Sequence, residues 1–213
     1  MRISGVVCAG LLLASCNMVT SATPLFSSAD ARQPGFRSGV WLVEDKTCAV
    51  DTTKPMTEWP DCADAWLVHP GEILAGRDPS KPLVSWTHFK TVLTRGDPAV
   101  MQIGVGPEGT DPGGFAYAGV RVLKTDAERR VVEYRTWAAL CGPPPPPNPN
   151  GQNSAVLTDK LLPGLVADKH KQDCIASDKA PVLASVKPGK TKTATTPTPP
   201  AGSATATNRR QAI

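Results

Sequence analysis

Cysteine is the residue type in this chain whose chemistry is easiest to predict. Six cysteines occur in the 213 residues, at positions 8, 16, 48, 62, 141 and 174. The first lies in the uncharged run from Ile3 to Ser15, which follows the positive charge of Arg2. Because this run is shorter than the about 20 apolar residues that span a bilayer, residues 1–15 are predicted to be a secretory signal peptide.

The four cysteines beyond residue 16 are predicted to form two disulfides, because their even number suits an oxidising compartment. Four cysteines permit three pairings, and sequence alone does not choose among them. We favour Cys48–Cys62 and Cys141–Cys174, because each pair closes a loop that needs a covalent constraint. A four-cysteine zinc site is the alternative, although such sites usually contain close C-x₂-C pairs and this sequence has none.

The predicted signal ends in Leu13-Ala14-Ser15-Cys16, a leucine and two small residues before a cysteine. This stretch resembles the lipobox of bacterial lipoproteins. The resemblance implies that the Cys16 thiol receives a diacylglyceryl group, that the signal is cut before Cys16, and that the new amino group is acylated. Two or more acyl chains hold a protein stably on a membrane. The alternative is an ordinary secretory signal that is cut near Ser21-Ala22.

The destination of such a lipoprotein depends on the residue that follows the cysteine. Here that residue is Asn17 rather than the aspartate that retains lipoproteins at the inner membrane of enteric bacteria. The resemblance therefore implies a lipid anchor in the outer membrane, with the protein facing the periplasm. Residues Trp59 to Ala63 (Trp-Pro-Asp-Cys-Ala) are similar to a pattern in uncharacterised small envelope lipoproteins of proteobacteria, which implies no particular activity.

No catalytic, metal-binding or cofactor-binding residue is predicted. The three histidines, His69, His88 and His170, show no helical ligand spacing with one another. The chain has no Gly-x-Ser-x-Gly elbow, and oxidation would leave no free cysteine nucleophile. Residues Gly104 to Gly109 match the dinucleotide fingerprint, but loop sequence follows where a helix would have to begin. We therefore expect a protein that is not an enzyme, and an envelope hydrolase is the least favoured alternative.

Charge is distributed unevenly along the chain, whose formal net charge is +4. Residues 187–213 contain five basic residues and no acidic one, whereas residues 16–186 contain 17 basic and 19 acidic residues. A nucleic-acid partner would require a basic face on the folded domain, so none is expected. The tail of 27 residues, rich in Thr, Pro and Ala, cannot bury enough apolar surface to offset its ordering entropy and is predicted to be disordered.

The remaining chain is divided into a tether, residues 16–35, and one disulfide-stapled β-rich domain, residues 36–186. Alternating runs at 115–123 and 131–138, separated by polar residues, predict a β-hairpin. Shorter runs of strand length precede it, at 39–43, 65–69, 72–75, 83–86, 89–93 and 100–105. This pattern predicts a mainly β fold, a single small antiparallel β-barrel or sandwich with one short C-terminal helix that starts near Asp178.

The motif Gly39-Val40-Trp41, at the start of the first predicted strand, is similar to the Gly-x-Trp motif of lipocalins. The resemblance implies an eight-stranded barrel in which the tryptophan closes one end and a small apolar ligand fills the interior. A lipocalin-like carrier is therefore the first alternative. The favoured hypothesis is a non-enzymatic binding or structural module that is held on the membrane by the lipid on Cys16 and has an envelope protein or a small apolar ligand as its partner.

Overall fold

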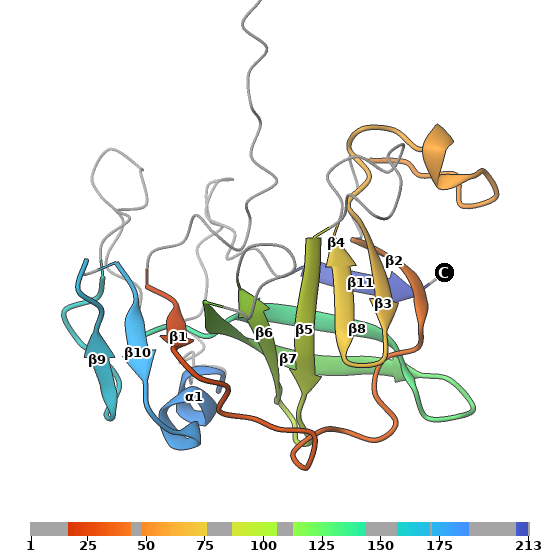
Figure 1. Cartoon of the computed structure of the whole chain (residues 1–213). Helices are drawn as coiled ribbons and strands as arrows, with labels where there is room; N and C mark the ends of the chain where they lie inside the picture. Colours follow the sequence, from red (N-terminus) through yellow and green to blue (C-terminus); the bar gives the residue numbers. More distant parts are fainter. Residues whose placement is uncertain are drawn as a thin grey trace, which may run out of the picture.

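The computed structural model describes residues 17–43, 48–75, 87–105, 113–143, 157–170, 172–187 and 208–212. This part of the chain is mainly β, as the sequence predicts, with one short α-helix and one 3₁₀-helix (Figure 1). The elements are β1 (Val19–Ser21), β2 (Gly39–Val43), η1 (Met56–Glu58), β3 (Ala65–His69), β4 (Glu72–Ala75), β5 (Thr87–Leu93), β6 (Ala99–Val105), β7 (Gly114–Thr125), β8 (Val131–Ala138), β9 (Leu165–Ala167), β10 (Cys174–Ala176), α1 (Lys179–Ser185) and β11 (Asn208–Ala212).

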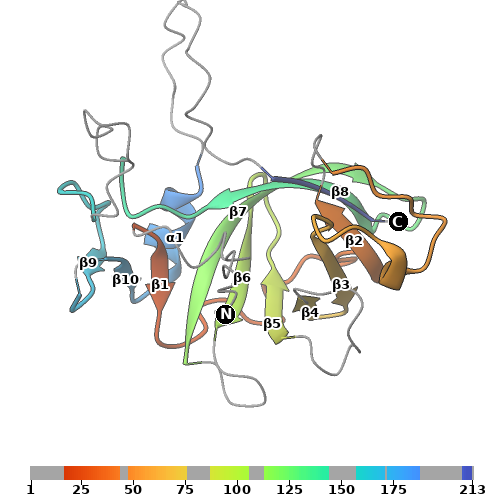
Figure 2. The same ribbon diagram turned by 90° about the horizontal axis from the view of Figure 1, so that it is seen from above.

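Strands β2 to β8 form an antiparallel meander in which each strand pairs with the next along the chain. The last strand, β11, pairs with β8 on one side and with β2 on the other, so that the pairings of these eight strands return to their starting point. The sheet as a whole is not closed, because it continues from β7 through β1 and β10 to a free edge at β9. Figure 2 shows this extension beside the ring of strands.

Alternation along the central strands places apolar residues on both faces of the sheet. On β6, Ala99, Met101 and Ile103 belong to the core inside the ring, whereas Val100 belongs to a second core outside it. All seven residues of β6 except Val105 are buried, which is typical of a strand covered on both faces. The inner core therefore consists of apolar side chains that several strands contribute.

Three aromatic rings dominate one end of the inner core. Trp41 of β2 and Tyr134 of β8 lie with their ring centroids 5.4 Å apart, and Phe36 contacts both, at 5.6 Å from Trp41 and 5.0 Å from Tyr134. The indole Nε1 of Trp41 donates a hydrogen bond to the Arg37 carbonyl, so the polar atom of this buried ring is satisfied.

The outer core lies between the outer face of β6 and β7, the β1–β10 extension and α1. It contains the disulfide Cys141–Cys174, whose two cysteines are fully buried. Helix α1 begins at the predicted cap, where the Asp178 carboxylate accepts a hydrogen bond from the Ala180 amide. Trp137 on the outer face of β8 donates from Nε1 to the Val186 carbonyl and so connects the sheet to the end of this helix.

The predicted tether is wrong for residues 17–35, because this segment is part of the folded domain. Strand β1 pairs with both β7 and β10, and Val19 is fully buried. The buried amide of Gln102 then accepts hydrogen bonds from the backbone of Leu25 and Phe26. The composition of the segment, small and polar, did not indicate this role. Its order comes from backbone pairing and from Gln102, which is 76 residues away from Phe26 in sequence.

Two further comparisons with the predictions concern the tail and one predicted strand. Five residues of the tail that was predicted to be disordered, 208–212, form β11, whereas 188–207 lie outside the described residues. The predicted strand at 83–86 also lies outside them. Among the residues that the structure describes, no helix is long and apolar enough to cross a membrane.

Candidate functional site

The cysteines that the sequence analysis singled out fall into three groups. The structure joins Cys48 to Cys62 and Cys141 to Cys174, which confirms the favoured pairing. Cys16, the predicted lipidation site, lies just outside the described residues, which begin at Asn17. The histidines do not form a site: His88 contacts Glu72 at 3.0 Å on an exposed surface, and no group of three metal-ligating side chains occurs among the described residues.

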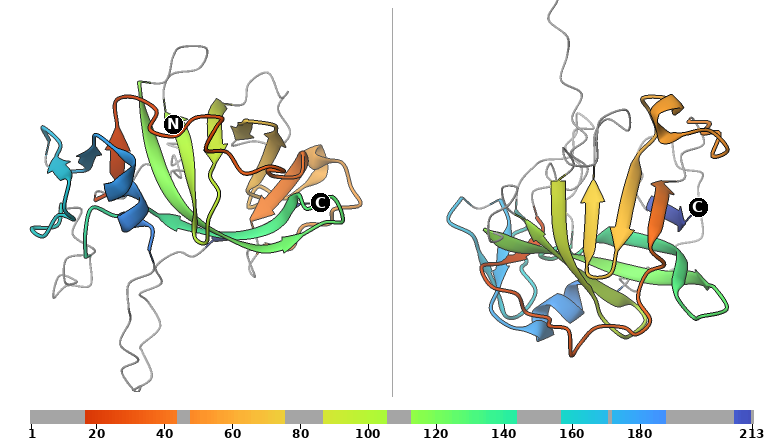
Figure 3. Two further views of the ribbon diagram at one scale, coloured as in Figure 1. Left: turned by 90° about the horizontal axis from the view of Figure 1, so that it is seen from below. Right: turned by 45° about the vertical axis from the view of Figure 1, so that its right-hand side comes forward.

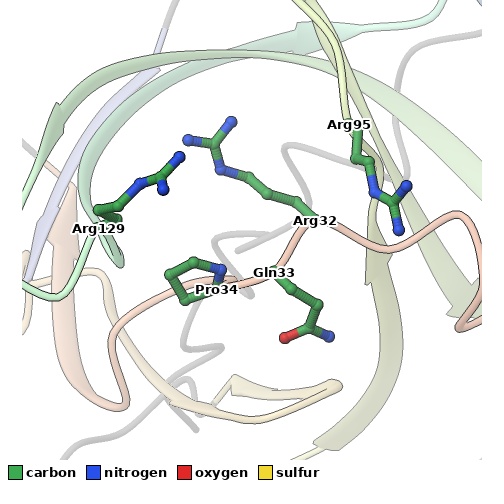
Figure 4. Close-up of a pocket in the computed structure, with 5 residues that line it drawn as sticks. All are labelled: Arg32, Gln33, Pro34, Arg95 and Arg129. Atoms are coloured by element: carbon green, nitrogen blue, oxygen red, sulfur yellow. The ribbon is translucent and has the colours of Figure 1, made fainter.

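A cavity of about 270 Å³ lies at one end of the ring of strands. Its walls come from three separate segments, and three of its five lining residues are arginines (Figure 4): Arg32, Gln33, Pro34, Arg95 and Arg129. In Figure 4 the guanidinium groups of Arg32 and Arg129 point toward the same space, whereas that of Arg95 is turned away from them. Among the described residues, the lining contains no carboxylate, imidazole, hydroxyl or thiol group.

The segment 26–38 crosses this end of the ring and carries Arg32 into the cavity; Figure 3 shows its path in the view from below. At one point the segment is held by the turn after β5, where Ala31 bridges to Thr94 and the Arg32 amide donates to the Leu93 carbonyl at 2.7 Å. At a second point it is held by the start of β8, where Phe36 bridges to Val131. Arg32 therefore has a rigid backbone on both sides.

The other two arginines belong to the turns that hold this segment. Arg95, in the turn between β5 and β6, donates from its side chain to the carbonyls of Ala31 and Ala29. Arg129, in the turn between β7 and β8, has a φ of 64°, a left-handed conformation that residues other than glycine rarely adopt. Its amide donates to the Asp126 carbonyl, which stabilises the turn in this conformation.

The acidic residues near the cavity are paired with other cations. Asp97, in the same turn as Arg95, contacts Arg121 at 3.5 Å. Asp126 and Glu128, in the same turn as Arg129, both contact Arg130 at 2.8 Å. Partial burial by itself would raise the pKa of Asp126, but hydrogen bonds from the Arg130 side chain and amide hold the pKa below its usual value. These three carboxylates are therefore paired with Arg121 or Arg130 and not with the cavity arginines.

The three cavity arginines lack such a partner. Among the described residues, none of Arg32, Arg95 and Arg129 has a carboxylate within ion-pair distance. The Nε atom of Arg32 is buried and has no hydrogen-bond partner in the described part of the chain. A buried donor without a partner costs about 1–3 kcal/mol, more when it is charged.

The arrangement suits the binding of an oxyanion. A guanidinium group is a planar fork of N–H donors that matches carboxylate and phosphate oxygens in a bidentate geometry. The sequence analysis missed this site, because Arg32 lies in the predicted tether and the other two lie in separate turns. No spacing in the sequence brings the three together, and only the crossing of segment 26–38 does so.

A second surface carries exposed apolar side chains. Val166 of β9 and Ile175 of β10 are paired across the two strands and are 67% and 42% exposed. They lie on the hairpin that forms the free edge of the sheet. Exposed apolar residues at a free strand edge are a common feature of surfaces that contact other proteins.

Comparisons of the chain with family models, with curated proteins and with solved structures find no match.

Proposed function

We propose that this chain is a non-enzymatic binding lipoprotein of the bacterial envelope, and that its three-arginine cavity binds an anionic group of its partner. The lipid on Cys16 would hold it at the outer membrane, facing the periplasm. The observation that carries the binding proposal is the cavity itself: three arginines without a carboxylate partner among the described residues, one of them with a buried, unpartnered Nε.

Two features support the envelope location. The stretch Leu13-Ala14-Ser15-Cys16 resembles a lipobox, and the two disulfides of the domain suit an oxidising compartment. Replacement of Cys16 by serine should release the protein from membranes in fractionated cells, because the lipid is the anchor. Membrane retention of Cys16→Ser equal to that of the unmodified chain would contradict the anchor.

The shape of the interior favours this proposal over a lipocalin-like carrier. A carrier needs an enclosed apolar cavity of a few hundred Å³. Here Phe36, Trp41 and Tyr134 pack against one another inside the ring, and the cavity at its end is lined mainly by arginines. Among the described residues, the same lining offers no side chain suited to general acid or base catalysis. A hydrolase is therefore supported less well than a binding protein.

The binding proposal can be tested by titrating the purified domain with inorganic phosphate and with acetate, followed by calorimetry and by NMR shifts of the arginine side chains. Arg129→Ala and Arg32→Lys should each weaken binding about tenfold or more, because a hydrogen bond to a charged group contributes about 1.5–3 kcal/mol. Arg32→Lys keeps the charge but loses the planar fork. Binding should also weaken as salt is raised.

Arg121→Lys is the matched control for Arg32→Lys, since Arg121 is a partly exposed arginine of β7 that is already paired with Asp97, and lysine keeps a cation beside that carboxylate. It should leave the affinity unchanged. The proposal is wrong if neither anion shows saturable binding, or if Arg121→Lys weakens binding as much as Arg32→Lys does.

A further inference from the structure

Strand β11 is the only strand that lies between β2 and β8 in the described sheet. Its residues Arg210, Gln211 and Ala212 pair with Val43, Leu42 and Trp41 of β2, and its residues 208–211 pair with 133–136 of β8. The two neighbours do not pair with each other. Without β11 the ring would have a slot one strand wide, bordered by two rows of backbone donors and acceptors. The right-hand view of Figure 3 shows β11 in this position beside β2.

The slot has a defined shape that does not depend on β11. Strand β2 is held by β3 through four residue pairs, and β8 is held by β7. Beneath the slot, the rings of Trp41 and Tyr134 are in contact, and Phe36 packs against both. The Arg37 amide also donates to the Val131 carbonyl and links the entry to β2 with the start of β8. The two edges are therefore fixed relative to each other by side chains and backbone outside β11.

Backbone pairing on both edges attaches β11 in the slot. The sequence of β11 is Asn-Arg-Arg-Gln-Ala, which contains no large apolar residue, so its attachment depends chiefly on the backbone ladder. Glu133 of β8 pairs in register with Gln211 of β11 on one side and with Lys124 of β7 on the other. Addition of an extended segment to such an edge is a common mode of peptide recognition.

The chain between α1 and β11 is long enough for β11 to come either from the same copy of the protein or from another. Residues 188–207, twenty residues in all, lie between Lys187, the last described residue after α1, and the start of β11. When extended, twenty residues span up to about 66–72 Å, at about 3.3–3.6 Å per residue. A domain of about 150 residues has a radius of gyration of about 15 Å, so this reach exceeds its diameter.

We propose that the slot between β2 and β8 is a strand-acceptor site, and that a second copy of this chain can fill it with its own residues 208–212. The pairing contacts in such an exchange are the same within one chain and between two chains, so exchange depends only on local concentration. A linker of this length gives an effective concentration in the millimolar range, so exchange becomes appreciable where copies are crowded together.

Two full-length variants test the exchange. The acceptor carries Thr136→Cys, at the position that pairs with Asn208, and Arg210→Pro, which removes the backbone donor at the centre of its own closing strand. The donor carries Asn208→Cys and is mixed with the acceptor at rising concentration in a glutathione redox buffer. Non-reducing mass spectrometry should then detect a heterodimer joined by a disulfide between the two introduced cysteines, and its yield should rise with concentration.

The controls separate specific exchange from random cross-linking. A donor that carries Asn208→Cys with Arg210→Pro should give about one tenth of the heterodimer, because the proline removes a ladder hydrogen bond, whereas Asn208→Cys with Arg210→Lys should give the full yield. A single chain with Thr136→Cys and Asn208→Cys should form the bond internally. Equal yields from the proline and lysine donors would overturn the proposal, as would a mixture of acceptor and donor that forms no heterodimer at millimolar concentration.

Discussion

At the residue scale, Gly119 on β7 and Trp137 on β8 face each other across the ladder, and the indole ring occupies the space above the glycine. A Cβ atom at position 119 would overlap Cε2 of Trp137. The ring cannot move freely, because its Nε1 donates to the Val186 carbonyl at the end of α1. The glycine therefore allows the sheet and the helix to be joined through this one tryptophan.

Gly119→Ala should lower the free energy of unfolding by about 1–3 kcal/mol, the usual cost of overpacking a well-packed site. Urea denaturation monitored by tryptophan fluorescence measures the change. Gly35→Ala is the control, since a Cβ there would meet its nearest atom at 3.7 Å, an ordinary van der Waals contact. Its effect should stay within about 0.5 kcal/mol, as for most surface substitutions. Equal effects of the two substitutions would contradict the role assigned to Trp137.

At the element scale, the two disulfides constrain different parts of the fold. Cys48–Cys62 closes a loop of sequence separation 14 between β2 and β3, and Cys62 is exposed. Cys141–Cys174 has a sequence separation of 33 and connects the chain beyond β8 with β10 in the centre of the outer core. The second bond therefore holds the β1–β10–β9 extension against the ring of strands.

Replacement of Cys141 and Cys174 together by alanine should lower the stability more than the same change at Cys48 and Cys62. In the chain-entropy model the losses are about 4 and about 3 kcal/mol, and the buried pair also loses packing in the outer core. Urea unfolding of the two double variants checks the order. Hydrogen exchange should increase at β10 in the first variant and not in the second; the reverse order of stability would contradict this assignment.

At the scale of the whole molecule, carboxylates that are bound in the folded state make stability depend on acid. The pKa of Asp30 is lowered from 3.8 to about 2, because Lys179 of α1 and the Ser27 amide donate to it. The pKa of Asp168 is also lowered, by hydrogen bonds from the amides of Gln172 and Asp173. The Lys179–Asp30 contact connects α1 to the segment that contains Asp30, whereas the Asp168 contacts lie within the β9–β10 turn.

The lowered pKa values of Asp30 and Asp168 determine how stability changes with pH. A carboxyl group whose pKa is lower in the folded state contributes stability above its unfolded pKa, and this contribution is lost as the pH falls through the folded pKa. The melting temperature should therefore fall from roughly pH 5 to pH 2. Asp30→Asn and Lys179→Met should each make this fall shallower, and both should lower the melting temperature at pH 7. A slope between pH 4 and pH 2 that neither substitution changes would contradict the role of this pair.

The arrangement of the molecule also bears on the proposed anchor and cavity. In Figure 1 strand β1 lies on the left and the segment 26–38 runs along the lower edge. Because β1 begins at Val19, three residues after Cys16, a lipid on Cys16 would hold the folded domain close to the membrane surface without an intervening tether. The sequence analysis had assigned these residues to a spacer, so this closeness is a result of the structure alone.

The amino-acid sequence by itself determined those features that depend on neighbouring residues. The hairpin of β7 and β8, strands β2, β3 and β4, and the cap of α1 at Asp178 all follow from local alternation, turns and capping. The disulfide pairing, which the sequence favoured but did not determine, also agrees with the structure.

Only the tertiary structure decided the features that depend on distant partners. Strands β1 and β11 are short, polar or small in composition, and ordered by backbone pairing with strands far away in sequence. Arg32, Arg95 and Arg129 share no motif and meet only because segment 26–38 crosses the end of the ring between two turns. Hydrophobic periodicity in the sequence indicates which face of a helix or strand is buried. A site that three loops form together has no such periodic signal, so only the packing of the folded chain determines it.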